Sequence, residues 1–347
     1  MKLIVPKYYS DFSCLASACS DSCCKGWDIF IDDKTYKKYM ALEGPLAERF
    51  RECIGVCADG AYFKMSGGRC PFLDSSELCE IIKFHGEEYL SDICRHHPRF
   101  YTVLGDIAFG GIGISCEAAA ELVLSEKLPH SYIKIANFDR DPEECDEELR
   151  DLIMQKKQII VCIFNDFLLE FKEKLFKTAE VLYELQSEID GAPITSRSIP
   201  AGSYAIENIL GLLSGLEYMS SGFAERIGIA LLSGEPKLIS RSDLTERIFL
   251  YLLDRHLPRA AEDGDAIGKG RVVFLLSLLF SLLSESDAQS EPVSQKSDRI
   301  GKARIPKAAI SAAKLISSEL EYSEENTLAI EERVGIISSV LSLLSDT

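Results

Sequence analysis

The chain has 347 residues, 46% of them hydrophobic and 27% charged, which is the composition of a folded globular protein and excludes a disordered or fibrous one. Asp and Glu number 55 against 38 Lys and Arg, so the net charge is −17, which argues against non-specific nucleic-acid binding through phosphate contacts. The length favours two domains, each large enough to bury a core without disulfides.

The first residues carry only a short apolar stretch, Leu3 to Val5, before Pro6 and a polar segment. A secretory signal peptide needs an apolar core of about 7 to 15 residues, so we predict a cytoplasmic protein. The longest apolar run, Val272 to Leu283, is interrupted by Ser277 and Ser281 and is shorter than the roughly 20 residues that span a bilayer. We therefore expect a buried helix there and no membrane insertion.

The N-terminal third concentrates the cysteines, because ten of the 12 lie in residues 1–116. Short apolar runs alternate there with Gly, Pro and Asp, which predicts a strand at 27–31, the start of a helix at 34–41 and a loop at 65–73. Beyond residue 140 the apolar spacing becomes helical. We therefore predict a cysteine-rich metal or iron–sulfur cluster domain at 1–140 and a helical domain at 141–347.

Apolar residues between Leu149 and Leu185 recur at intervals of three, four or seven positions, which predicts one long helix or two. Gly191, Pro193 and Pro200 then break the pattern. Further helices are expected at 203–216, 222–232, 243–256, 271–284, 306–320 and 325–345, with a polar surface loop at 284–302. The predicted fold class is mainly α: an irregular cysteine-rich metal-binding N-terminal domain with little β, followed by an all-helical C-terminal domain.

A glycine-rich stretch, GDIAFGGIG at 105–113, precedes Ser115 and Cys116. A dinucleotide-binding fingerprint needs G-x-G-x-x-G between a strand and a helix, with an acidic residue about 20 positions later. The glycine order here differs, so we interpret the stretch as a turn or a strand. The sequence also lacks the serine-hydrolase elbow, the P-loop and the His-Glu-x-x-His zinc motif.

The close spacing of the N-terminal cysteines suits a metal site. Disulfides are rare in a reducing compartment, whereas thiolates within a turn or two of one another bind soft metals. The spacing leaves zinc and an iron–sulfur cluster open, since each takes four thiolates. We interpret Cys53, Cys57, Cys145 and Cys162 as small apolar residues. The pattern is Cys14-x4-Cys19-x3-Cys23-Cys24, then Cys70-x8-Cys79, then Cys94 and Cys116.

Several short blocks together resemble the flagellin lysine-N-methylase (FliB) family. The first blocks are Phe12-Ser13-Cys14, Ala18-Cys19-Ser20-Asp21 and Cys23-Cys24-Lys25-Gly26-Trp27. The later blocks are Cys70-Pro71-Phe72-Leu73-Asp74, Leu78-Cys79, Ile93-Cys94 with Pro98-Arg99, and Ser115-Cys116-Glu117-Ala118-Ala119. The N-terminal part is similar, more broadly, to zinc- or iron-chelating domains that contain a cysteine pair.

The resemblance implies an enzyme that transfers methyl groups from S-adenosylmethionine to surface lysines of flagellin. It also implies an iron–sulfur cluster, of the 4Fe-4S type, with zinc as the alternative metal. The three-cysteine signature of radical S-adenosylmethionine enzymes is absent, because Cys24 follows Cys23 directly. A cluster needs four ligands, and the resemblance does not say which four. The positions that carry over as metal ligands are Cys14, Cys19, Cys23, Cys24, Cys70, Cys79, Cys94 and Cys116.

Two other interpretations use the same thiols. One is a non-catalytic zinc- or iron-chelating protein with a helical partner-binding domain, and the other is a zinc-stabilised structural adaptor. Methyl transfer would require a neutral lysine amine, whose ordinary pKa of about 10.4 must be lowered by desolvation or by a nearby base. The sequence assigns no catalytic residue to that step. It offers the aromatic Trp27 beside the cysteine pair as a neighbour of a metal site. It offers the same role to the residues near Cys94, which are Arg95, His96, His97 and Arg99.

Overall fold

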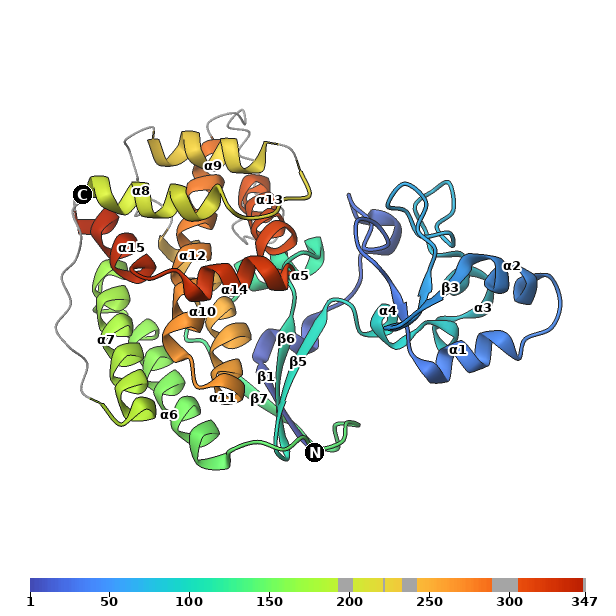
Figure 1. The fold of residues 1–347 in the computed structure, drawn as a ribbon, viewed down its shortest axis with the longest axis horizontal. Coiled ribbons are helices and arrows are strands. Elements are labelled where there is room, and N and C mark those ends of the chain that lie inside the picture. The colour runs from blue at the N-terminus through green and yellow to red at the C-terminus, as the bar shows by residue number, and fades with distance from the viewer. Residues whose placement is uncertain (193–201, 221, 233–241, 289–304, 346–347) are drawn as a thin grey trace, which may run out of the picture. The chain divides into compact units, whose positions relative to one another are not determined.

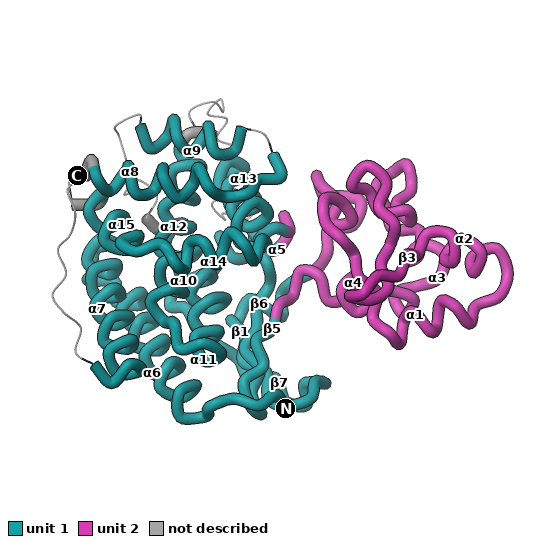
Figure 2. Tube along the Cα trace, viewed as in Figure 1, with its two compact units in different colours: residues 1–12, 101–115, 119–347 teal, residues 13–100, 116–118 magenta. Residues whose placement is uncertain are grey.

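The computed structural model describes residues 1–192, 202–220, 222–232, 242–288 and 305–345 (Figure 1). The chain divides into two compact units (Figure 2), of which unit 1 comprises residues 1–12, 101–115 and 119–347, and unit 2 comprises residues 13–100 and 116–118. The division therefore differs from a single boundary at residue 140. Strands near the start of the chain pair with strands beyond residue 100, so the segment between them forms a unit of its own.

Unit 2 combines a small antiparallel sheet with short helices. In the sheet, β4 lies between β2 and β3, with Phe30 opposite Tyr62 and Ile54 opposite Phe63. The Asp32 side chain caps the first helix by accepting the amide of Thr35 at 2.8 Å. The elements are η2 (Ala16–Ala18), β2 (Phe30–Ile31), α1 (Asp33–Met40), α2 (Pro45–Cys53), β3 (Ile54–Cys57), β4 (Gly60–Phe63), α3 (Glu80–His85), η3 (Glu87–Tyr89) and α4 (Asp92–His96).

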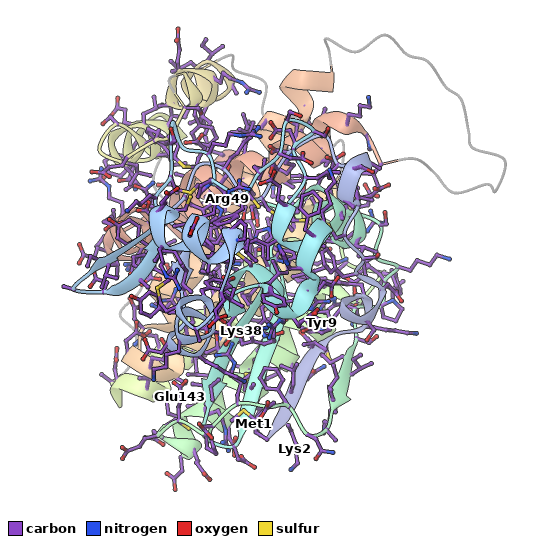
Figure 3. All side chains as sticks on the ribbon, turned by 90° about the vertical axis from the view of Figure 1, so that its right-hand side faces the viewer. Met1, Lys2, Tyr9, Lys38, Arg49 and Glu143 are labelled. Carbon is purple, nitrogen blue, oxygen red and sulfur yellow. The ribbon has the colours of Figure 1, made fainter. Side chains whose placement is uncertain are left out.

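Aromatic rings form the centre of unit 2. Tyr39 stacks on Phe50 with ring centroids 3.9 Å apart, and Phe72 packs on Phe50 at 4.7 Å. Such ring pairs stabilise a core by about 0.5 to 1.5 kcal/mol beyond their buried area. The Arg49 and Lys38 side chains, labelled in Figure 3, donate to backbone carbonyls of other segments of the unit, those of Pro71 at 2.8 Å and Glu88 at 2.7 Å. These two hydrogen bonds connect α1 and α2 to the segments near Cys70 and Cys94.

A four-stranded sheet begins unit 1, formed by β1 (Lys2–Pro6), β5 (Arg99–Leu104), β6 (Ile107–Ile112) and β7 (Tyr132–Ile135) in the order β5-β6-β1-β7. Strand β1 runs parallel to β6 and antiparallel to β7. Gly105 forms the turn between β5 and β6 at a φ of +66°, a conformation that favours glycine. The glycine-rich stretch is thus a turn followed by a strand, as the sequence indicated.

Helices make up the rest of unit 1. They are η1 (Lys7–Asp11), α5 (Glu117–Leu124), α6 (Glu147–Phe164), α7 (Phe171–Asp190), α8 (Gly202–Leu213), α9 (Phe223–Leu232), α10 (Ser242–His256), η4 (Leu257–Arg259), α11 (Ala260–Asp263), α12 (Ala266–Ala288), α13 (Lys307–Ile316), the π-helical turn Ser317–Glu321, α14 (Glu324–Glu332) and α15 (Ile336–Ser345). The α12 helix packs against α7, α9, α10, α13, α14 and α15, so it is the central helix of the bundle (Figure 1). The predicted class, mainly α, is confirmed.

The central helix is longer than its sequence pattern suggested. A stretch of 20 residues, Ala266–Glu285, is long and apolar enough to cross a membrane, so the argument from a short apolar run was wrong. The prediction of burial is confirmed, since 89% of its apolar window is buried. Gly270 permits close packing there, because a Cβ at that position would lie 2.7 Å from Leu182 Cδ1. A helix that is apolar on all sides is typical of a bundle centre.

Two segments have different bounds in the structure from those that the sequence predicted. The helix expected at 325–345 is two helices, α14 and α15, because Gly335 adopts a φ of +84° between them. The loop expected at 284–302 begins later, since α12 continues to Ala288, and positions 289–302 lie outside the described residues.

Candidate metal centre and buried polar network

Five of the eight predicted metal ligands lie together in unit 2. Cys70 is buried in the aromatic core, and Cys24, Cys79 and Cys94 pack against the same core. The fifth, Cys23, directly precedes Cys24 in the chain. The backbone brings them there from distant segments, since the Cys70 amide donates to the Cys24 carbonyl at 3.0 Å. The Leu73–Cys79 bridge closes the loop that carries the third thiol. The Asp92 amide donates to the Asp32 side chain at 2.9 Å, which anchors α4 and its Cys94.

These thiols perturb one another's protonation. A hydrogen bond from Cys24 lowers the pKa of the Cys23 thiol to about 7, while the same bond and burial raise the pKa of Cys24. Burial, with a smaller contribution from neighbouring thiols, raises the pKa of Cys70 to about 11 and that of Cys94 to about 12. Burial also raises the pKa of Cys79. Metal ions bind thiolates, so a cation at this site would have to replace the tightly held protons of the four thiols whose pKa is raised.

The five thiols fit a soft metal or an iron–sulfur cluster in the chemistry of their sulfur donors. They do not converge on one point: among the described residues, no three His, Cys, Asp or Glu side chains are arranged as the ligands of a metal ion. The candidate site therefore consists of cysteine thiols from four segments of the chain, which lie in or against the hydrophobic core of unit 2.

The other three predicted ligands lie elsewhere in unit 2. The Cys19 thiol donates to Glu117 Oε2 at 3.6 Å, and the amide and hydroxyl of Ser20 donate to the same oxygen at 2.9 and 2.5 Å. Glu117 follows Cys116 directly, so this contact explains why residues 116–118 associate with unit 2. The exposed Cys14 thiol accepts the amide of Ala16 at 3.3 Å. The predicted set of eight therefore splits into the five thiols of the core group and three others, Cys14, Cys19 and Cys116.

Trp27, His97 and Arg95, which the sequence offered as neighbours of a metal site, contact the backbone or one another. Trp27 donates its indole N–H to the Cys23 carbonyl at 2.8 Å and stacks on His97 with ring centroids 6.2 Å apart. Burial lowers the pKa of His97 to about 4, so its imidazole is neutral. Arg95 donates to the Leu90 carbonyl at 3.0 Å, which places that guanidinium on the backbone of the same segment.

Unit 1 contains a buried polar network that no motif in the sequence indicated. His130 bridges two carboxylates, with Nδ1 2.8 Å from Glu126 Oε1 and Nε2 3.0 Å from Asp254 Oδ2. Asp254 Oδ1 also accepts the Tyr132 hydroxyl at 2.6 Å and lies 2.5 Å from Lys157 Nζ. Both carboxylates and both cations are almost fully buried. Their charges balance, which makes an interior ion cluster tolerable.

This network predicts a loss of stability in mild alkali. Burial disfavours the His130 imidazolium, but Asp254 and Glu126 outweigh burial and raise its pKa to about 9. The imidazolium therefore adds stability at and below pH 6.5, its ordinary pKa, and that contribution disappears as the pH rises through 9. The free energy of unfolding should fall by roughly 2–3 kcal/mol between these pH values. Urea unfolding measures it, and a His130→Gln variant with the same decline would contradict the assignment.

Comparison with known proteins gives relatives for part of the chain. The flagellar biosynthetic protein FliU of Salmonella muenchen is 30% identical over 164 residues, which are 45% of this chain and 94% of FliU. The chain belongs to the flagellin lysine-N-methylase family. Proteins named lysine-N-methylase from Salmonella choleraesuis and Salmonella typhimurium are each 30% identical over 128 residues, 35% of this chain. The resemblance predicted from the cysteine blocks is confirmed.

The matches to the lysine-N-methylases cover only part of those proteins. The chain spans about a third of the length of the lysine-N-methylases, since the matched residues are 32% of each. No protein-family model and no solved structure matches the chain.

Proposed function

We propose that this protein transfers methyl groups from S-adenosylmethionine to surface lysines of flagellin, and that the transfer depends on an iron–sulfur cluster in unit 2. The observation that carries the proposal is the gathering of five thiols from four segments in one core, in a family whose members are named lysine-N-methylase. The name of FliU, a flagellar biosynthetic protein, favours flagellin as the substrate.

The chemistry is a polar methyl transfer. The lone pair of a neutral lysine amine attacks the methyl carbon, the carbon–sulfur bond of the sulfonium breaks, and its electron pair stays on sulfur. The methylated amine then loses a proton to a base or to water. No electron is gained or lost overall, so the step needs no external oxidant or reductant.

The thiols of the core group are the ligands that we assign to the cluster. Cys70, Cys79 and Cys94, with either Cys23 or Cys24, supply the four thiolates that a 4Fe-4S cluster takes. When bound, the cluster supplies a rigid inorganic core that links segments far apart in the sequence. Cys14, Cys19 and Cys116 are outside this set. A zinc ion on the same four thiolates is the alternative metal.

The charge of the protein suits a lysine-bearing substrate. An exposed acidic run stands between β7 and α6 and continues into that helix. Its acidic residues are Asp139, Asp141, Glu143, Glu144, Asp146, Glu147 and Glu148. A surface of one sign attracts a protein of the opposite sign and speeds their encounter.

Methylation of purified flagellin is the test of this function. Full-length protein purified without oxygen should add methyl groups to flagellin lysines when S-adenosylmethionine is present, as detected by mass spectrometry of the peptides. Protein stripped of metal with a chelator is the matched control and should lose this activity. Metal-loaded protein that contacts flagellin but leaves every lysine unmodified would favour the non-catalytic chelating interpretation.

A further inference from the structure

The outer face of α6 leaves a row of apolar side chains in contact with solvent. This helix lies at the edge of the bundle, where it packs against α7, α10 and α11 (Figure 1). Its inner face, which includes Ile160 and Phe164, is buried. At helical spacing the outer face carries Ile159, which is 42% exposed, the exposed Cys162 and the half-buried Ile163. A surface helix normally carries polar side chains on that side.

The turn after α6 extends this apolar row. Phe167 and Leu168 are 69% and 92% exposed, and in the described part of the chain they form the one pair of consecutive large apolar residues that are both exposed. The Asp166 side chain accepts the Leu168 amide at 2.9 Å. The His130 amide donates to Asn165 Oδ1 at 2.7 Å, and Asn165 Nδ2 donates to the His130 carbonyl at 3.0 Å. Hydrogen bonds on both sides of Phe167 thus fix the turn that presents it to solvent.

Exposed apolar groups that follow one another in this way mark a binding surface. Single exposed apolar residues are common on soluble proteins, whereas contiguous ones occur where another molecule binds. The α6 surface, as we call it, consists of Ile159, Cys162, Ile163, Phe167 and Leu168. These five residues come from one helix face and the turn that follows it, so one partner can contact all of them.

The other end of the same helix face is acidic. The exposed acidic run before α6 continues to Glu148, which lies on the outer face about three turns before Ile159. The lysines of α6 leave this charge in place, because Lys157 is buried and Lys156 pairs with Glu188 of α7 at 2.6 Å. The outer face of α6 therefore has an acidic N-terminal end and an apolar C-terminal end.

This arrangement favours a cationic partner over a second copy of the chain. In a two-fold dimer with antiparallel α6 helices, the acidic end of each helix would face the apolar end of the other. With parallel helices, the two acidic ends would face and repel each other. A partner in which apolar side chains lie beside lysines is complementary to both ends of the face.

We propose that the α6 surface docks flagellin through a segment in which apolar side chains lie beside lysines, an assignment that rests on the proposed methyl transfer to that protein. Contact with Phe167 and Leu168 provides most of the affinity, because removing such side chains from water is favourable. The acidic end near Glu148 attracts the lysines and speeds the encounter. A docked flagellin keeps its other surface lysines at a high local concentration.

Steady-state methylation of flagellin by the full-length, metal-loaded protein tests this assignment. The double variant Phe167→Ser with Leu168→Ser should raise KM for flagellin by about tenfold or more. It should leave kcat unchanged, because the surface binds flagellin and touches no reacting atom. The Kd for flagellin, measured by calorimetry, should rise by the same factor. The melting temperature should not change, since both side chains are exposed in the folded protein.

Ile229→Ser is the matched control, since Ile229 is 62% exposed on α9, which packs against α8 and α12. It should leave KM and Kd unchanged. Glu144→Gln combined with Glu148→Gln should slow association with flagellin at low salt and leave dissociation unchanged. The change at Phe167 and Leu168 should instead speed dissociation, as the loss of apolar contacts usually does.

The outcomes separate this assignment from the proposed function. A wild-type protein that methylates flagellin, with an unchanged KM in the Phe167→Ser, Leu168→Ser variant, would overturn the docking assignment alone. A fall in kcat at unchanged KM would also overturn it. A wild-type protein that neither binds nor methylates flagellin would overturn both. Light scattering provides a last check: a wild-type dimer that the double variant converts to monomers would show that a second copy covers the α6 surface, against the assignment.

Discussion

Cys70→Ser should abolish the metal content of the protein. Iron with matching acid-labile sulfide is expected in wild-type protein purified without oxygen. Its loss is expected in the variant, because Cys70 is the most buried of the five gathered thiols and a serine hydroxyl is a poor ligand for iron or zinc. Metal and sulfide analysis measures the result. The Cys23→Ser and Cys24→Ser variants, measured singly and together, decide which of the adjacent pair is the fourth ligand.

Cys57→Ser is the matched control for this change. Cys57 is exposed at the end of β3, where its thiol donates to the Gly60 carbonyl at 3.5 Å, so its metal content should equal that of wild type. A second control separates ligation from packing: adding chelator should lower the denaturant concentration at which wild type unfolds and should leave that of Cys70→Ser unchanged. Zinc without sulfide would instead favour the chelating or adaptor interpretation, and retention of iron in Cys70→Ser would exclude this thiol from the site.

The helices were predictable from the sequence because their signal is local. Apolar spacing located α6 to α10 within a few residues, since each buries one face against its neighbours. The same spacing could not divide α14 from α15, because Gly335 breaks the helix through its backbone conformation. The four-stranded sheet was missed. Leu3 pairs with Ala108 and Ile135, and pairings across more than 100 residues leave no periodic trace in a short window.

The sequence identified the cysteines of the candidate metal site, but it did not show which of them lie near one another. Short motifs identified eight cysteines. Which of them belong to the core group follows from contacts between distant segments, such as the hydrogen bond from the Cys70 amide to the Cys24 carbonyl and that from the Cys19 thiol to Glu117. The interior network around His130 had no motif at all. Asp254 and His256 resemble the polar face of an ordinary helix, and only the packing of α10 against α12, β6 and α6 shows that they are buried.

Lys157→Met should destabilise unit 1 by about 3–5 kcal/mol, the usual cost of breaking a buried ion pair from one side. Lys157 is 4% exposed, and its Nζ lies 2.9 Å from the Tyr132 hydroxyl as well as beside Asp254. The change leaves Asp254 buried with His130 as its remaining cationic partner. Urea unfolding followed by circular dichroism measures the loss.

A second substitution identifies the cause of that loss. Asp254→Asn removes the negative charge that loses its lysine partner in Lys157→Met, so the double variant should be more stable than the sum of the two single changes predicts. Methionine keeps the length and most of the packing of the lysine side chain, so lost volume contributes little. If Lys157→Met costs less than about 1 kcal/mol, the pair behaves like an exposed one, and the burial that we assign to the network is incorrect. A large cost with a coupled double variant makes these charges a fixed anchor between α6 and α10.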